Sequence, residues 1–122
     1  MLQKGSVITC ADNSGAKNLN VITTLGQKRR AFATVGDVVV CSVRKAQSGA
    51  TIADHQVVKA VIVRTRKEIR RKDGSYIRFD DNAAIIIDKN KLPVGTRVFG
   101  PIAREIRDLG YLKIASLAEE VW

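Results

Sequence analysis

The sequence predicts a mainly β protein, a small β-barrel that short C-terminal helices close. Two observations predict this class: most segments are short, apolar and bounded by turn residues, and a helical period appears only near the end of the chain. Several segments are apolar on both faces, and such strands need a sheet that curls on itself, because open edges invite aggregation. At 122 residues the chain is a single domain, 1–122, with a barrel over about 1–100 and a helical part over about 101–122.

The expected strands follow one another up to residue 87. Segments 6–12 and 19–26 flank a turn at Asn13, Ser14 and Gly15 and predict an early hairpin. The second of them alternates, which places four residues on one side: Leu19, Val21, Thr23 and Leu25. Segments 35–46 and 55–65 begin apolar and end basic, and the continuously apolar segment 83–87 is typical of a strand covered on both faces.

The helical period appears only after these strands. The first predicted helix starts at Pro101, which suits the first helical position, and ends at Gly110, which can adopt the left-handed conformation. Its apolar stripe recurs at i, i+4 and i+7: Ile102, Ile106 and Leu109. Arg104 and Arg107 then share its outer face. A second short helix follows from a stripe at i, i+3, i+4 and i+7: Ile114, Leu117, Ala118 and Val121.

The charge of the chain points to a polyanionic partner. Lys and Arg number 21 against 12 Asp and Glu, which gives a net charge of +9 and a pI near 10.0. Such a field favours nucleic acid first and an anionic membrane second. The longest apolar runs are far shorter than the ~20 residues of a spanning helix, and no leader pattern is present, so we expect a non-secreted, cytoplasmic protein without a membrane partner.

Residues that carry enzyme chemistry are scarce. Cys10, Cys41 and the lone His55 do not match a usual zinc pattern, and we interpret the cysteines as reduced apolar residues in strands, with a disulfide between them as the alternative. The chain has no phosphate loop, no G-x-S-x-G elbow and no H-E-x-x-H pair. We therefore expect no catalytic residue, metal, cofactor or small-molecule substrate.

A strongly basic ribbon over about 64–80 is the most informative part of the sequence. Asp73-Gly74 is a signal for a two-residue hairpin turn, because both central residues of a type I′ turn need positive φ. That turn pairs Lys72 with Ser75, Arg71 with Tyr76, and Arg70 with Ile77. An arginine then interrupts each face, so neither face suits a protein core and the ribbon is expected to project.

Arginines interleaved with aromatic rings suit RNA, since guanidinium groups fork onto phosphates and rings lie on bases or sugars. The alternative is a solvated hairpin whose charges keep an edge soluble. The candidate RNA-binding residues of the ribbon are Tyr76 and the cations Arg64, Arg66, Lys67, Arg70, Arg71, Lys72 and Arg78. A rival function from another class is a basic β-barrel adaptor that binds acidic protein surfaces.

Further candidate RNA-binding residues lie outside the ribbon. The basic ones are Lys17, Lys28, Arg29, Arg30, Arg44 and Lys45. If these residues and Arg97 lie on the same side of the protein as the ribbon, together they form one binding surface for a polyanion. If they are dispersed over the surface, their charges only keep the protein soluble. The turn residues Asn13 and Ser14 are available for hydrogen bonds to the nucleic-acid backbone.

Several motifs in order resemble the universal large-subunit ribosomal protein L-fourteen family of bacteria and organelles, over nearly the whole chain. They are ADNSGA at 11–16, VGD at 35–37, KAVIVRT at 59–65, DGSYIRFDDNA at 73–83, GTRVFGP at 95–101, RE at 104–105 and KIASLA at 113–118. Ile85, Asn18 and the loop DKNKLPV depart from the usual pattern, which puts Asn18 in doubt as a phosphate ligand and leaves the fold unaffected.

The resemblance implies a five-stranded barrel, a projecting β-ribbon and two short C-terminal helices. It implies a ribosomal, non-enzymatic protein that binds large-subunit rRNA, reaches small-subunit rRNA at the subunit interface, and touches the neighbouring proteins L-three and L-nineteen. A ribosome silencing factor is a further implied partner, for which the resemblance points to Thr96, Arg97 and Lys113; we count Arg104 and Arg107 with this surface. The ribosome is then that of a bacterial cytoplasm or of an organelle.

Overall fold

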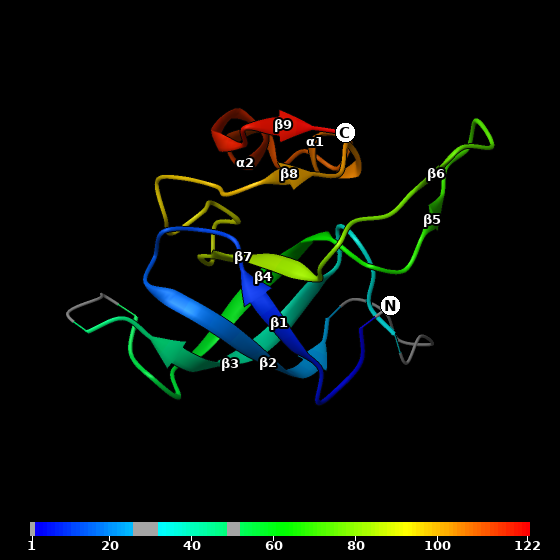
Figure 1. Cartoon of the computed structure of the whole chain (residues 1–122). Coiled ribbons are helices and arrows are strands. Elements are labelled where there is room, and N and C mark those ends of the chain that lie inside the picture. Colours follow the sequence, from blue (N-terminus) through cyan, green and yellow to red (C-terminus); the bar gives the residue numbers. More distant parts are fainter. Residues whose placement is uncertain (1, 26–31, 49–51) are drawn as a thin grey trace.

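The computed structural model describes residues 2–25, 32–48 and 52–122 (Figure 1). Its centre is a closed barrel in which neighbouring strands follow the order β1-β2-β3-β4-β7. These strands are β1 (Val7–Cys10), β2 (Ala16–Thr24), β3 (Val38–Ala46), β4 (Val57–Arg64) and β7 (Ala83–Ile87). The pair β1–β7 is parallel and the other neighbours are antiparallel. The predicted mainly β class and the five-stranded barrel are confirmed.

Aliphatic side chains fill the barrel. All residues of β7 are buried, as predicted from its continuous apolar run, because the strand lies between β1 and β4 and is covered on both faces. In β2, Leu19 and Val21 are buried, but a register shift follows Val21 and leaves Thr23 and Leu25 exposed. The predicted alternation of this strand is therefore correct only in its first half.

The two cysteines are free and buried in β1 and β3, which confirms the interpretation as small apolar residues and removes the disulfide alternative. Burial raises the pKa of each thiol to about 12.

His55 stands exposed in a turn with a φ of 64°. Neither helix of the described residues approaches the length needed to cross a bilayer.

The ribbon consists of β5 (Ile69–Arg70) and β6 (Tyr76–Ile77), which leave the barrel after β4 and return into β7. Figure 1 shows it extending away from the barrel, as predicted, and it lies on the same side of the barrel as the end of the chain.

The C-terminal part comprises β8 (Pro101–Ile102), α1 (Glu105–Asp108), α2 (Leu112–Leu117) and β9 (Glu120–Val121) and lies over one side of the barrel (Figure 1). Two short helices are confirmed, but their bounds are not: Pro101 and Val121, predicted to be helical, lie in a parallel pair of strands. Tertiary pairing overrides the local helical period here, since the main chain of Ala103 donates to Val63 in the barrel and that of Trp122 donates to Ile102.

Candidate nucleic-acid interface

The turn of the ribbon is one residue longer than predicted. Arg71 and Ser75 pair across a three-residue loop: the N–H of Arg71 donates to the carbonyl of Ser75 at 2.8 Å, and that of Gly74 donates to the carbonyl of Arg71 at 3.0 Å. Gly74 has a φ of 88°, as expected where a type I turn is followed by a bulge in the left-handed region. Asp73 stabilises the loop, because its carboxylate accepts the hydroxyl and N–H of Ser75 at 2.6 and 2.9 Å, and these bonds lower its pKa.

The longer turn shifts the cross-strand pairs by one residue. Ile69 lies opposite Ile77 and Arg70 lies opposite Tyr76, whereas the two-residue turn predicted Arg70 opposite Ile77. A shift of one residue moves the side chains of one strand to the other face. The predicted pairs are therefore wrong. An arginine, Arg71, still lies on the same face as Ile69 and Ile77, but that face is partly buried.

The face of the ribbon that carries Ile69 and Ile77 is turned inward. Ile69 and Ile77 are half-buried opposite each other, and Ile69 and Phe79 pack against the core. The N–H of Phe79 also donates to the carbonyl of Thr65 at 3.0 Å, which ties the base of the ribbon together.

The opposite, outer face is basic. Arg70 and Tyr76 are directly opposed and exposed, and Tyr76 is among the most exposed large hydrophobic residues at 63%. The exposed cations of the ribbon are Arg66, Lys67, Arg70, Lys72 and Arg78. Glu68 lies among them and accepts a hydrogen bond from Lys67 at 2.9 Å, which is the main cause of its lowered pKa, with Arg78 contributing. We call Tyr76 and these five cations the outer face.

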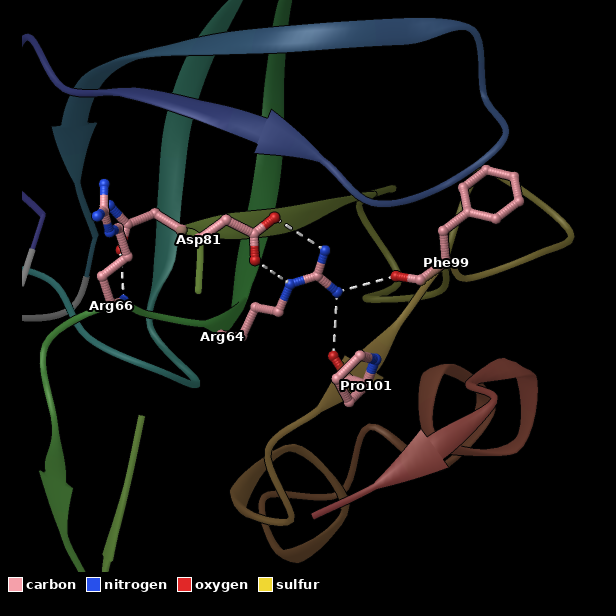
Figure 2. A network of polar contacts seen from close by, with 6 residues as sticks. Arg64, Arg66, Asp81, Phe99 and Pro101 are labelled. Atoms are coloured by element: carbon pink, nitrogen blue, oxygen red, sulfur yellow. Dashed lines mark hydrogen bonds and ion pairs between the residues drawn. The ribbon is translucent and has the colours of Figure 1, made fainter. Parts of the chain in front are cut away.

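Two of the seven predicted ribbon cations point into the protein instead. Arg64 is buried at 8% exposure at the end of β4, and Figure 2 shows its guanidinium surrounded by acceptors. Its Nε and Nη2 donate to the two carboxylate oxygens of Asp81 at 2.6 and 3.1 Å. Its Nη1 donates to the carbonyls of Phe99 and Pro101 at 2.9 and 3.0 Å. Arg64 therefore joins the barrel to the entrance of β7 and the start of β8.

Arg71 is the second inward cation, with 15% of its side chain exposed. Its Nε donates to Oε1 of Glu105 at 2.8 Å, and its Nη2 donates to the main-chain oxygen of Trp122. By contrast, the side chain of Arg66 is exposed, and its main-chain N–H donates to Oδ1 of Asn82 at 2.8 Å.

A second basic cluster lies at the far end of the barrel strands. Lys17, Arg44 and Lys45 are exposed where the start of β2 runs beside the end of β3. Figure 1 shows this end on the side of the barrel opposite the ribbon, so the outer face and this strand-end cluster are separate surfaces and not one footprint. The predicted residues Lys28, Arg29 and Arg30 lie outside the described residues.

Asn13 organises the loop before β8. Its Oδ1 accepts the N–H groups of Thr96 and Arg97 at 2.8 and 3.0 Å, and its Nδ2 donates to Oγ1 of Thr96 at 2.9 Å. Ser14 is buried and donates to a carboxylate oxygen of Asp12 at 2.6 Å. Both side chains predicted to contact RNA backbone are thus bonded within the protein, and Asn13 instead shapes the loop of two predicted partner-surface residues.

The remaining residues of the predicted partner surface are exposed. Arg104 is the N-cap residue of α1, Arg107 lies on α1, and Lys113 lies on α2. Arg104 lines a cleft between α1 and the ribbon together with Arg70 and Lys72. Within the described residues, no group of three His, Cys, Asp or Glu side chains is placed to hold a metal ion.

Sequence reasoning missed the acidic and carbonyl partners of the two inward arginines. Asp81 is 17 residues from Arg64, and Glu105 is 34 residues from Arg71. No local pattern connects residues at these separations. The adjacent carboxylates of Asp80 and Asp81 are the one local signal in the sequence, and they do not indicate which arginine one of them binds.

Comparison with known proteins identifies similar chains over the full length. The family model described as Ribosomal protein L14p/L23e matches residues 1–122. A curated relative, the large ribosomal subunit protein uL14 of Petrotoga mobilis, is 67% identical over 122 residues, which cover 100% of both chains.

Proposed function

This chain belongs to the ribosomal protein L14p/L23e family, and from that membership we propose that it binds large-subunit rRNA through the outer face of its ribbon. It is a protein of the large ribosomal subunit, a component of the ribosome and not an enzyme. The predicted family, the predicted large-subunit membership and the predicted non-enzymatic role are therefore confirmed. The bacterial relative supports the cytoplasmic ribosome over that of an organelle. The adaptor for acidic protein surfaces has no observation in its favour.

The observation that carries the proposal is the separation of the ribbon into two faces. Arg70 and Tyr76 stand opposite each other on the exposed side, while Ile69 and Ile77 stand opposite each other on the inner side. A guanidinium fork beside a free aromatic ring suits a phosphate and its base or sugar. Because the apolar side chains point inward, RNA has to desolvate only the basic face.

The strand-end cluster supports contact with a second RNA segment. Lys17, Arg44 and Lys45 lie across the barrel from the ribbon, so one small domain can neutralise phosphates on two sides. We keep small-subunit rRNA, the proteins L-three and L-nineteen, and the ribosome silencing factor as proposed partners. Their proposed contact residues are Thr96, Arg97, Arg104, Arg107 and Lys113.

The test is the salt dependence of binding to deproteinised large-subunit rRNA. Arg70→Ala should lower the slope of log K against log[salt] by about one, since one phosphate contact is lost. Tyr76→Ala should weaken binding about tenfold at an unchanged slope, because it removes stacking and no charge. Lys4→Ala removes an exposed cation outside both basic surfaces and serves as the control. Unchanged affinity and slope in both ribbon variants would refute the proposal.

A further inference from the structure

Arg71 differs from the other cations near the tip of the ribbon. It directly precedes the loop, yet its side chain is largely covered, whereas its neighbours Arg70 and Lys72 are exposed. Its position opposite Ser75 places it on the same side of the ribbon as Ile69 and Ile77. The side chain therefore points toward α1 and away from the outer face.

Two distant parts of the chain receive this guanidinium. Glu105 is the first residue of α1, and Trp122, whose main-chain oxygen accepts the second bond, lies just beyond β9. They are 34 and 51 residues from Arg71, so the contact joins the ribbon to two separate elements of the C-terminal part. The Nε and Nη2 donors of Arg71 therefore both bind acceptors within the protein.

Glu105 is held in turn by Arg71. Its Oε1 accepts the Nε of Arg71 at 2.8 Å, while its Oε2 is buried and has no hydrogen-bond partner among the described residues. A carboxylate in this position needs its cation, because a half-buried charge without a partner is costly. Arg71 and Glu105 are thus mutually required, and a phosphate that drew Arg71 outward would leave Glu105 unpaired.

The ribbon needs such an attachment because its own strands are very short. β5 and β6 have two residues each, and a two-stranded ribbon on its own is marginally stable in water. Near the barrel, the ribbon is held by the buried Arg64 and by the bond between Phe79 and Thr65. Arg71 is the outermost of these attachments.

We propose that Arg71 is a positioning residue, which with Glu105 and Trp122 fixes the direction of the ribbon against the C-terminal part and is not itself a phosphate ligand. This inference rests on the proposed function of the outer face. A ribbon fixed before RNA arrives does not lose conformational freedom on binding, and this raises affinity without any added contact.

The sharpest test compares two glutamates that each pair with a ribbon cation. Glu105 pairs with Arg71 on the inner side at 2.8 Å, and Glu68 pairs with Lys67 on the exposed side at 2.9 Å. Glu105→Gln and Glu68→Gln both remove one negative charge, so electrostatics alone predicts tighter RNA binding for both. Positioning predicts that Glu105→Gln weakens binding to deproteinised large-subunit rRNA about tenfold at an unchanged salt slope, while Glu68→Gln binds equally or more tightly.

Substitutions of the arginine itself separate positioning from direct contact. For a phosphate ligand, Arg71→Ala lowers the salt slope by about one, as Arg70→Ala does, and Arg71→Lys retains the slope and most of the affinity. For a positioning residue, both Arg71 variants weaken binding at an unchanged slope, because lysine does not reproduce a fork that reaches two acceptors.

Hydrogen exchange in the RNA-free protein gives an independent measure. We expect faster amide exchange at Ile77 and Phe79 in Glu105→Gln and Arg71→Ala, with exchange in β4 and β7 unchanged, which also shows that the barrel remains folded. Unchanged exchange in the ribbon, tighter binding by Glu105→Gln, or a slope lowered by Arg71→Ala would each overturn the inference. If Arg70→Ala and Tyr76→Ala leave binding unaltered, the proposed function fails, and the exchange data still decide whether Arg71 fixes the ribbon.

Discussion

Replacing Arg64 by alanine is the substitution for which the structure predicts the largest loss of stability. The residue is only 8% exposed. Its side chain donates four hydrogen bonds, two to Asp81 and one each to the carbonyls of Phe99 and Pro101 (Figure 2). These bonds connect three segments: the end of β4, the entrance to β7 and the start of β8. Their loss should loosen the junction between the barrel and the C-terminal part.

The cost can be bounded from these contacts. Removing one partner of a buried ion pair costs about 3–5 kcal/mol. The side chain of Asp81 is 42% exposed, so water solvates its carboxylate and the ion pair contributes less than that range. The two carbonyls lose a donor at about 1 kcal/mol each. We therefore expect a loss of about 3 kcal/mol in the free energy of unfolding, and a Tm lower by about 10 °C for a domain of this size.

The assay is thermal and urea unfolding of Arg64→Ala beside Arg66→Ala. The control removes the same charge two residues later, from an exposed side chain whose main-chain bond to Asn82 is retained. It should change stability by no more than about 0.5 kcal/mol. Equal Tm values for the two variants would refute the role of Arg64 as a junction. For RNA binding we expect the larger effect from Arg66→Ala, since of the two substitutions only this one should lower the salt slope.

Two further predictions concern stability. Gly100→Ala should destabilise the protein more than Gly74→Ala. Both glycines have positive φ, which costs about 1–2 kcal/mol for alanine. A Cβ at Gly100 would in addition lie 2.8 Å from Nη1 of Arg64, whereas nothing lies within 4 Å of a Cβ at Gly74. Equal Tm losses would contradict this. Burial raises the pKa of Cys41 from 9.0 to about 12, so the unfolded thiol ionises first and the free energy of unfolding should fall as the pH rises through this range. Urea titrations from pH 8 to 10.5 should show a weaker fall in Cys41→Val; parallel curves would exclude the contribution.

The barrel was predictable because its information is local. Continuous apolar runs such as 83–87 and segments that begin apolar and end basic mark strands without knowledge of their neighbours. The bounds of the helices were harder to predict, because a four-residue helix such as α1 is too short to show a clear hydrophobic period. Pairing with β9 also decides the conformation of Pro101. The register of the ribbon was missed because Asp73-Gly74 fits both a two-residue turn and a longer loop with glycine at its end.

Composition, periodicity and turn residues are properties of neighbouring positions, so the amino-acid sequence alone predicts a basic, mainly β domain with a projecting ribbon. Which cations of that ribbon face solvent depends instead on contacts between segments that are distant in the sequence. Arg70 and Arg71 are equivalent in the sequence, but one lies opposite Tyr76 in solvent and the other reaches Glu105. The reason is physical: a guanidinium turns inward only where acceptors at the right distance compensate for its lost water, and the chain supplies those acceptors from positions far along the sequence.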